Sequence, residues 1–401
     1  MHSFLIAALL FFAGSGPQSG YRAESWIEAF PGEMAFNGRL HFTARVHASE
    51  PILASRLILA YDSSRYAFFP LKGYAPDGFS LAVEAVTATA LPFPFTDVTY
   101  WWEVDLPSGN ALVSEAQTFF YIDDRFAWNH LPRTNLDLYW VEGDWAAANG
   151  IADLALLSIG TISAELETPI PERITVVQYP KMADFHAALD GRIRGWEGAV
   201  SSPGAETVIL AAAPGAEGRA TLAVLLPHEI AHVLLGTRWG AGYALIPQWL
   251  REGIAAGYEM EPRPEQEIHL REAAAERSVI PIRTLCRVFP AEENPAMLAY
   301  AESKSFVAFL KQKYGLAAIR SALAAYAGGA ECDHGLEAVT GRKFSDLESA
   351  WLGTFADNGL FISASWALVL AGIVLLAGIL VVRGVLHRKN AKRTLERPGD
   401  K

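Results

Sequence analysis

The sequence predicts an α+β protein with a β-sandwich of immunoglobulin-like type over residues 22–133, a second domain over residues 134–357 and one transmembrane helix over residues 358–382. Three observations carry this prediction. Short alternating segments separated by turn residues fill the first range. Strand and helix patterns then give way to helices, which indicates a small sheet lobe followed by a helical lobe. The third range holds no charged side chain over 25 positions.

Both ends of the chain carry membrane-type signals. Residues 1–21 are predicted to be a signal peptide, because the apolar run Phe4–Ala13 is too short to cross a hydrocarbon core of about 30 Å and small residues follow it. The positive flank before that run is poor. Residues 383–401 hold seven Lys or Arg against two acids. Basic flanks face the cytoplasm, so we expect a single-pass protein of the cell membrane with its domains outside and its C-terminus in the cytoplasm.

Charge and cysteine content limit the partners and the redox state. A net charge of −11 over 401 residues argues against nucleic acid as a partner. The two cysteines, Cys286 and Cys332, lie in the part of the chain that we expect to face an oxidising compartment. A disulfide between them and two free buried thiols both remain open.

In the first domain, strands are expected at Leu40–Val46 and Ser55–Tyr61, and a turn at Pro107–Asn110 separates two more. The aromatic run Tyr100–Trp102 could be a ligand platform. Such residues more often form the core and the edge of a sandwich, and we favour that interpretation.

The second domain is expected to order its elements as strand, helix, strand, helix and strand. The strands are predicted at residues 135–143, 173–180 and Thr207–Ala213, and the helices at residues 145–166 and 181–196. From Ile268 on, nearly every segment has helical spacing.

The stretch "LLPHEIAHVLL", residues 225–235, places three polar side chains in an apolar helix. Because Pro227 is tolerated only in a first turn, the helix is predicted to start near residue 225 or 226. His228 and His232 are four positions apart and share one face, so both imidazoles can reach one Zn²⁺ at about 2.0–2.1 Å. Glu229 can reach a metal-bound water without ligating the ion.

Burial makes a metal the favoured partner of these groups. An unpaired buried polar group costs about 2–7 kcal/mol, against a domain stability of about 5–15 kcal/mol. A metal ion accepts the imidazole lone pairs and offsets the carboxylate. The alternative is a pair of hydrogen-bonded core histidines with a chance glutamate between them.

A second motif, "IPQWLREGIAAGYE", supplies a third candidate ligand. Glu252 lies 20 positions after His232, on a predicted helix that begins near Pro247. The apolar residues around it mark a buried side and let Glu252 face inward. Two histidines and one glutamate make a zinc set with one open position. The alternative is that Glu252 is an exposed acid beside Arg251.

The two motifs resemble the gluzincins, the clan of thermolysin and aminopeptidase N, and most closely the bacterial peptidase MA-like domain family. The resemblance covers roughly residues 135–357. It implies one Zn²⁺ held by His228, His232 and Glu252, the last in the clan's W-L-x-E-G setting. It also implies that Tyr300 stabilises the oxyanion, with a plain core aromatic as the alternative for that residue.

The chain departs from the clan's aminopeptidases in one respect. Those enzymes carry a G-x-M-E-N strand that captures the substrate's amino terminus, and "RGWEGAVSSPGAETVILAAA" lacks it. Glu197 is the one nearby acid, and its register is wrong. Exopeptidase action is therefore not expected, and Thr207–Ala213 could be an edge strand that aligns an extended peptide by main-chain pairing.

These features predict a membrane-anchored zinc endopeptidase that acts on peptides or proteins, with Glu229 as general base for a zinc-activated water. One rival is a catalytically inactive gluzincin-fold surface protein in which the β-domain binds a partner. Another is a zinc hydrolase of a non-peptide amide, because the same water attacks any polarised carbonyl.

Overall fold

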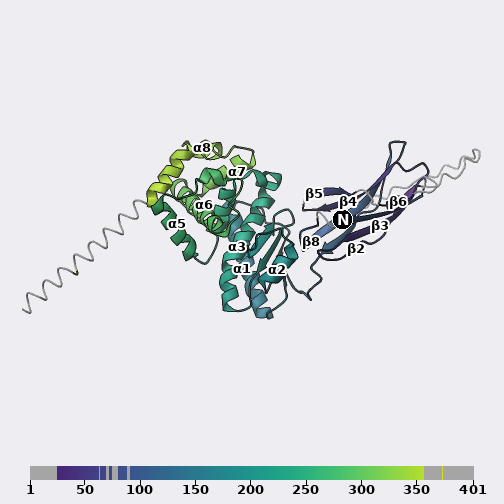
Figure 1. The fold of residues 1–401 in the computed structure, drawn as a ribbon, viewed down its shortest axis with the longest axis horizontal. Coiled ribbons are helices and arrows are strands. Elements are labelled where there is room, and N and C mark those ends of the chain that lie inside the picture. The colour runs from purple at the N-terminus through teal and green to yellow at the C-terminus, as the bar shows by residue number, and fades with distance from the viewer. Residues whose placement is uncertain are drawn as a thin grey trace, which may run out of the picture. The chain divides into compact units, whose positions relative to one another are not determined.

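The computed structural model describes residues 25–62, 64–68, 72–74, 80–87 and 91–355, together with residue 373. The expected signal peptide and cytoplasmic tail lie outside the described residues, and so does the expected transmembrane helix apart from that one residue. The chain divides into two compact units, residues 1–125 and 126–401 (Figure 1).

The first unit consists of two antiparallel sheets. One sheet has the strand order β1-β3-β7-β6, with β2 beside β3, and contains β1 (Trp26–Ala29), β2 (Glu33–Met34), β3 (Leu40–His47), β6 (Lys72–Tyr74) and β7 (Ser80–Thr87). The other has the order β10-β8-β4-β5, with β9 beside β8, and contains β4 (Ala54–Tyr61), β5 (Ser64–Phe68), β8 (Thr96–Asp105), β9 (Ala111–Val113) and β10 (Gln117–Tyr121).

Alternate residues of β3, β4 and β8 point into one shared core, as expected for strands with one buried face. The two sheets therefore form a sandwich, while its immunoglobulin-like type stays a prediction. Tyr100 and Trp102 are buried in this core. Trp101 lies on the other face of β8, where its indole N–H donates to Glu103 Oε1 at 2.9 Å. The core part of the favoured interpretation is confirmed, but Trp101 lies on the outer face of β8, which is an interior strand between β10 and β4 and not an edge.

The second unit is built on a five-stranded sheet of order β11-β12-β13-β15-β14. Its strands are β11 (Asn129–Arg133), β12 (Asn135–Trp140), β13 (Arg173–Tyr179), β14 (Ala199–Ser202) and β15 (Thr207–Ala211). The three central strands run parallel, and β11 and β14 pair antiparallel at the two edges. Because β11 belongs to this sheet, the units divide earlier than the boundary after residue 133 that we expected.

The expectation that Thr207–Ala213 forms an edge strand is wrong. β15 lies between β13 and β14, and all five of its residues are buried. The strands β14 and β15 form an antiparallel hairpin, and β14 takes the edge position. An apolar run indicates a strand with two covered faces, which is typical of a sheet interior.

The helices cover both faces of this sheet and then form the helical lobe. The elements are α1 (Trp145–Leu166), α2 (Met182–Leu189), α3 (Ala216–Trp239), the 3₁₀-helix η1 (Gly240–Leu245), α4 (Gln248–Gly257), α5 (Pro264–Glu276), the 3₁₀-helix η2 (Ile282–Cys286), α6 (Glu293–Tyr314), α7 (Leu316–Ala327) and α8 (His334–Thr340). A last helical segment occupies residues 344–355. The α1 and α3 helices share one core with the sheet, and Phe185 of α2 packs against Tyr179 of β13 on the other face.

The metal-motif helix starts earlier than expected. The α3 helix begins at Ala216, and Pro227 lies inside it rather than in its first turn. A proline in a helix interior costs about 3 kcal/mol, because its missing N–H leaves the carbonyl four residues earlier without a partner. Here that carbonyl, on Ala223, accepts the N–H of Met260 at 2.9 Å. A tertiary hydrogen bond thus replaces the helical one, and the proline is accommodated.

Among the described residues, two helices are long and apolar enough to span a membrane by length and composition alone, namely Trp145–Leu166 and Gly218–Leu245. Core helices of globular domains pass the same test. Both ranges contribute residues to the core of the second unit, so this is weak evidence for a span.

Cys286 and Cys332 form a disulfide that links η2 to the segment before α8, across a sequence separation of 46 residues. This decides between the two alternatives that the sequence left open. The bond closes a large loop of the helical lobe, and such closure stabilises a fold mainly by restricting the unfolded chain.

Candidate active site

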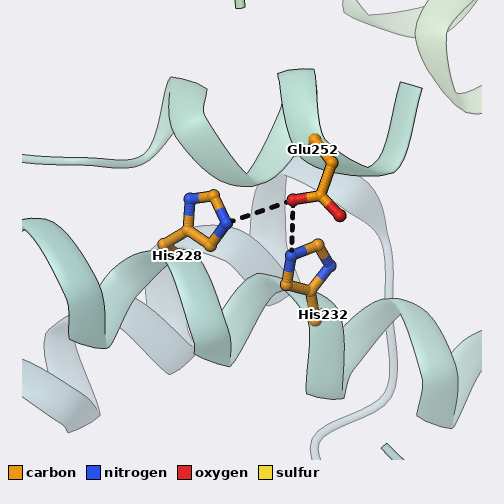
Figure 2. A group of neighbouring side chains, drawn as sticks. All are labelled: His228, His232 and Glu252. Carbon is orange, nitrogen blue, oxygen red and sulfur yellow. Dashed lines mark ion pairs between the residues drawn. The ribbon is translucent and has the colours of Figure 1, made fainter. Parts of the chain in front are cut away.

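Three of the residues that the sequence singled out converge where α4 crosses α3. His228 and His232 project from successive turns of α3, and Glu252 projects from α4 toward both (Figure 2). The Oε2 atom of Glu252 lies 3.3 Å from Nε2 of His228 and 3.3 Å from Nε2 of His232. One donor atom from each residue lies within 4.8 Å of the other two. The alternative of an exposed Glu252 beside Arg251 is wrong, because its side chain is only 12% exposed.

This geometry fits a single zinc ion. Two donors that bind Zn²⁺ at about 2.1 Å with tetrahedral angles lie about 3.4 Å apart, close to the spacing of the Glu252 oxygen from each imidazole. All three side chains are nearly buried, and two imidazoles with one carboxylate leave a fourth position open. The residues are therefore suited to hold the ion that the sequence predicts.

The charges of the cluster are strongly coupled. Burial by itself lowers the pKa of His228, but hydrogen bonds to Glu252 and Glu259 outweigh it and raise the pKa to about 10. Burial raises the pKa of Glu252, but electrostatic attraction to His232 and hydrogen bonds to both histidines outweigh burial and hold this pKa well below its ordinary value. Glu252 and Glu259 thus favour a positive charge at this site, and a bound cation would supply one.

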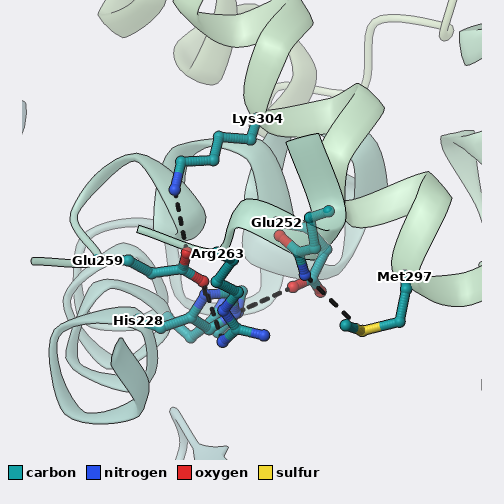
Figure 3. A network of polar contacts seen from close by, with 8 residues as sticks. His228, Glu252, Glu259, Arg263, Met297 and Lys304 are labelled. Atoms are coloured by element: carbon teal, nitrogen blue, oxygen red, sulfur yellow. Dashed lines mark hydrogen bonds and ion pairs between the residues drawn. The ribbon is translucent and has the colours of Figure 1, made fainter. Parts of the chain in front are cut away.

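A second acid, Glu259, fixes the orientation of His228. Its Oε1 atom lies 3.2 Å from Nδ1 of His228, and its carboxylate also pairs with Arg263 at 3.2 Å and Lys304 at 3.0 Å (Figure 3). Burial raises the pKa of Glu259, but the hydrogen bond to His228 and the charges of Arg263 and Lys304 outweigh burial and lower it, so the carboxylate stays an acceptor. A proton on Nδ1 leaves Nε2 free for a metal. Sequence reasoning missed Glu259, which follows the end of α4 at Gly257 and so has no helical spacing from Glu252 that could have indicated it.

The other histidine is oriented by a tyrosine. The hydroxyl of Tyr243, in η1, lies 3.0 Å from Nδ1 of His232. The guanidinium of Arg251 lies 4.8 Å from the centre of the Tyr243 ring. Burial raises the pKa of Tyr243, so the hydroxyl keeps its proton. No periodicity or motif in the sequence indicated this contact.

Glu229 lies beside the three ligands but holds a different partner. Its carboxylate accepts a hydrogen bond of 2.6 Å from Oγ of Ser201, on the edge strand β14. The side chain is buried on α3. The predicted base is therefore held at the meeting point of the metal-motif helix and the edge strand, a contact with no signal in the sequence.

Tyr300, on α6, is also brought to the site. Its ring centre lies 6.2 Å from that of His228, and the ring packs against Phe289 and Trp196. Burial and the charges of Glu252 and Glu229 raise its pKa, so the hydroxyl stays protonated. Within the described part of the chain this hydroxyl makes no hydrogen bond, which leaves it able to donate to a bound molecule.

The edge strand carries no acid. β14 reads Ala-Val-Ser-Ser, and Glu197 lies two residues before it. The carboxylate of Glu197 accepts the backbone N–H of Arg194 at 2.7 Å, so it serves the loop that precedes the strand.

Comparison with solved structures finds zinc peptidases whose sequences have low identity to this chain. An M1 zinc metallopeptidase from Deinococcus radiodurans has a TM-score of 0.36 and 13% identity, with 82% of this chain and 92% of that chain covered. A two-domain M1 zinc metallopeptidase mutant bound to L-arginine has a TM-score of 0.36 and 13% identity, with coverage of 79% and 89%. An aminopeptidase N family protein from Idiomarina loihiensis has a TM-score of 0.32 and 9% identity, with coverage of 63% and 58%.

Comparison with curated proteins finds no match. The sequence model of the Peptidase MA superfamily, in contrast, matches residues 147–357, which is more than half of the chain and contains both metal motifs. That range runs from α1 through the helical lobe and includes His228, Glu229, His232 and Glu252. The chain therefore belongs to the Peptidase MA superfamily.

Proposed function

We propose that the protein is a zinc-dependent endopeptidase that hydrolyses peptide bonds of extended peptides or unfolded proteins. One observation carries the proposal: the carboxylate of Glu252 lies 3.3 Å from the Nε2 atoms of both His228 and His232. The assignment to a superfamily of peptidases gives this cluster its chemical context.

The residues around the cluster have distinct roles in this proposal. Bound zinc would polarise the scissile carbonyl and activate a water molecule. Glu229, held by Ser201, accepts the proton of the attacking water and passes it to the leaving nitrogen. Tyr300 keeps its proton at neutral pH and donates a hydrogen bond to the developing oxyanion. Both steps need side chains that are held in place before the substrate arrives.

The substrate is proposed to bind along β14. This strand pairs with β15 on one side and ends the order of the described sheet on the other, so its second edge can pair with an extended main chain. Ser201 on the same strand already touches Glu229, so a peptide lying there would pass beside the base. No acid on β14 is available to hold a substrate's α-ammonium group, which supports cleavage within a chain rather than at its end.

The location is proposed mainly from the sequence. The uncharged run 358–382 followed by a basic tail supports a single membrane span with the peptidase unit outside the cytoplasm. The disulfide between Cys286 and Cys332 agrees with an oxidising compartment.

The deciding experiment compares the wild-type chain with Glu229→Gln on a fluorescently labelled unfolded protein. We expect the variant to keep one zinc per chain and to lose at least about 10²-fold in rate, because only the proton acceptor is removed. Glu267→Gln is the control and is expected to keep its activity, because this exposed acid of α5 pairs with Arg271 on the same helix. A metal chelator should abolish wild-type cleavage.

Two results would argue against the proposal. Undiminished hydrolysis by Glu229→Gln would exclude the assigned base. Wild-type chain that holds zinc but cleaves no unfolded protein would favour a binding protein or a hydrolase of another amide.

A further inference from the structure

Pro227 lies directly before the first metal-motif histidine, at a place where a helix interior normally excludes proline. The proline has no N–H to give to Ala223, four residues earlier, and its ring pushes that carbonyl away from the helix axis. The carbonyl is not left without a partner, because it accepts the N–H of Met260 at 2.9 Å.

Met260 immediately follows Glu259, the acid that contacts His228. The short segment after α4 is thereby attached to α3 through its backbone at Met260. The segment is also attached to α1, because the Tyr258 hydroxyl donates to Glu165 at 3.2 Å. Between these two points, the Glu259 carboxylate faces Nδ1 of His228 at 3.2 Å.

The side-chain contacts of Glu259 do not by themselves hold this residue against α3. Arg263 follows it by four residues and Lys304 comes from α6, so both cations neutralise the carboxylate from other directions (Figure 3). The Met260–Ala223 hydrogen bond joins the backbone of this segment to the helix that carries His228, five residues before that histidine.

We propose that Pro227 is a positioning residue for the metal site: by freeing the Ala223 carbonyl for Met260, it seats Glu259 against His228. The inference rests on the proposed zinc function. An N–H at position 227 would bond to Ala223 within the helix and compete with Met260. The segment would then lose its attachment to α3, Glu259 would no longer fix the His228 ring, and the ring would have to be ordered when zinc binds.

The test measures zinc affinity of the full chain by competition with a chelating dye. Loss of a residue that orients a metal-binding histidine typically costs 10–100-fold in affinity, so Glu259→Gln is expected in that range. Pro227→Ala is expected to weaken zinc about 10-fold. The double variant should bind no more weakly than Glu259→Gln alone, because both changes break one connection. Glu261→Gln, an exposed neighbour, is the control and should bind as the wild type.

A second readout separates positioning from general damage. Alanine favours a helix more than proline does, so the metal-free Pro227→Ala chain should unfold at the same temperature as the wild type or higher. The Met260 amide should exchange its hydrogen faster than in the wild type. Pro227→Gly restores the same N–H and should weaken zinc as well, which keeps the test usable if alanine hinders folding.

Three outcomes are decisive. Wild-type zinc affinity in Pro227→Ala, beside a weakened Glu259→Gln, overturns the inference and leaves the zinc site standing. Strictly additive losses in the double variant also overturn it. A wild-type chain that binds no zinc would instead overturn the proposed function.

Discussion

At the scale of single residues, the hydroxyl of Ser201 and the carboxylate of Glu229 form the short contact that holds the proposed base. A hydrogen bond to a charged group contributes about 1.5–3 kcal/mol, which corresponds to roughly tenfold or more in rate if it is needed in the transition state. Ser201 comes from a strand and Glu229 from a helix, so the contact depends on how the two elements pack.

We therefore predict that Ser201→Ala lowers kcat about tenfold with little change in KM and with zinc content unchanged. Ser201→Thr keeps the hydroxyl and should restore most of the rate. Steady-state kinetics on a peptide substrate check this. A change in KM alone would assign Ser201 to substrate binding and contradict the positioning role.

At the scale of elements, the crossing of α4 on α6 sets the position of Glu252. A Cβ built on Gly253 would collide with the backbone carbonyl of Ser303 and lie 2.6 Å from a methyl carbon of Val307. The glycine next to the metal ligand therefore lets the two helices approach closely, and this explains why the motif carries glycine there.

We predict that Gly253→Ala destabilises the protein by about 1–3 kcal/mol, because the added methyl forces α4 away from α6. It should also weaken zinc binding, since Glu252 moves with the helix. Gly257→Ala in the same helix is the control: a Cβ there meets nothing within 4 Å, so the change should be neutral or stabilise by up to about 1 kcal/mol. Urea unfolding of both variants measures the difference, and equal stabilities would contradict the prediction.

At the scale of the whole molecule, each unit has its own core, and that of the second unit includes one unusual group. Glu302 on α6 is fully buried, and its Oε1 accepts the N–H of Ile280 at 2.9 Å. Oε2 has no partner among the described residues. Burial raises the pKa of Glu302 to about 8, with a smaller contribution from the nearby charge of Glu348.

This pKa predicts a pH dependence of stability. The unfolded chain loses the Glu302 proton near its ordinary pKa of 4.5, whereas the folded protein keeps it until about 8. Between those values the folded state holds more protons, so its stability falls as pH rises, and the whole loss is present above about 8. Glu302→Gln should remove this part of the slope. Denaturant midpoints from about pH 5 to about pH 8 check it, and an unchanged slope would contradict it.

Much of the site could be predicted because helix periodicity is local. The spacing of His228 and His232 and the apolar setting of Glu252 identified three side chains that the structure brings together. The partners of the two imidazoles, Glu259 and Tyr243, were missed, since nothing in a single sequence says which polar residue meets a given ring nitrogen. The start of α3 was misplaced because the rule for proline considers the helix alone, while Met260 supplies the missing contact from elsewhere.

The sequence by itself determined the metal-motif helix and the three donor groups, because each follows from side chains a few residues apart. Tertiary structure decided that β14 rather than β15 lies at the sheet edge, that Ser201 meets Glu229 and that Cys286 bonds to Cys332. Each of these depends on the order in which distant segments pack. That order is set by the free energy of the whole core, which no short pattern contains.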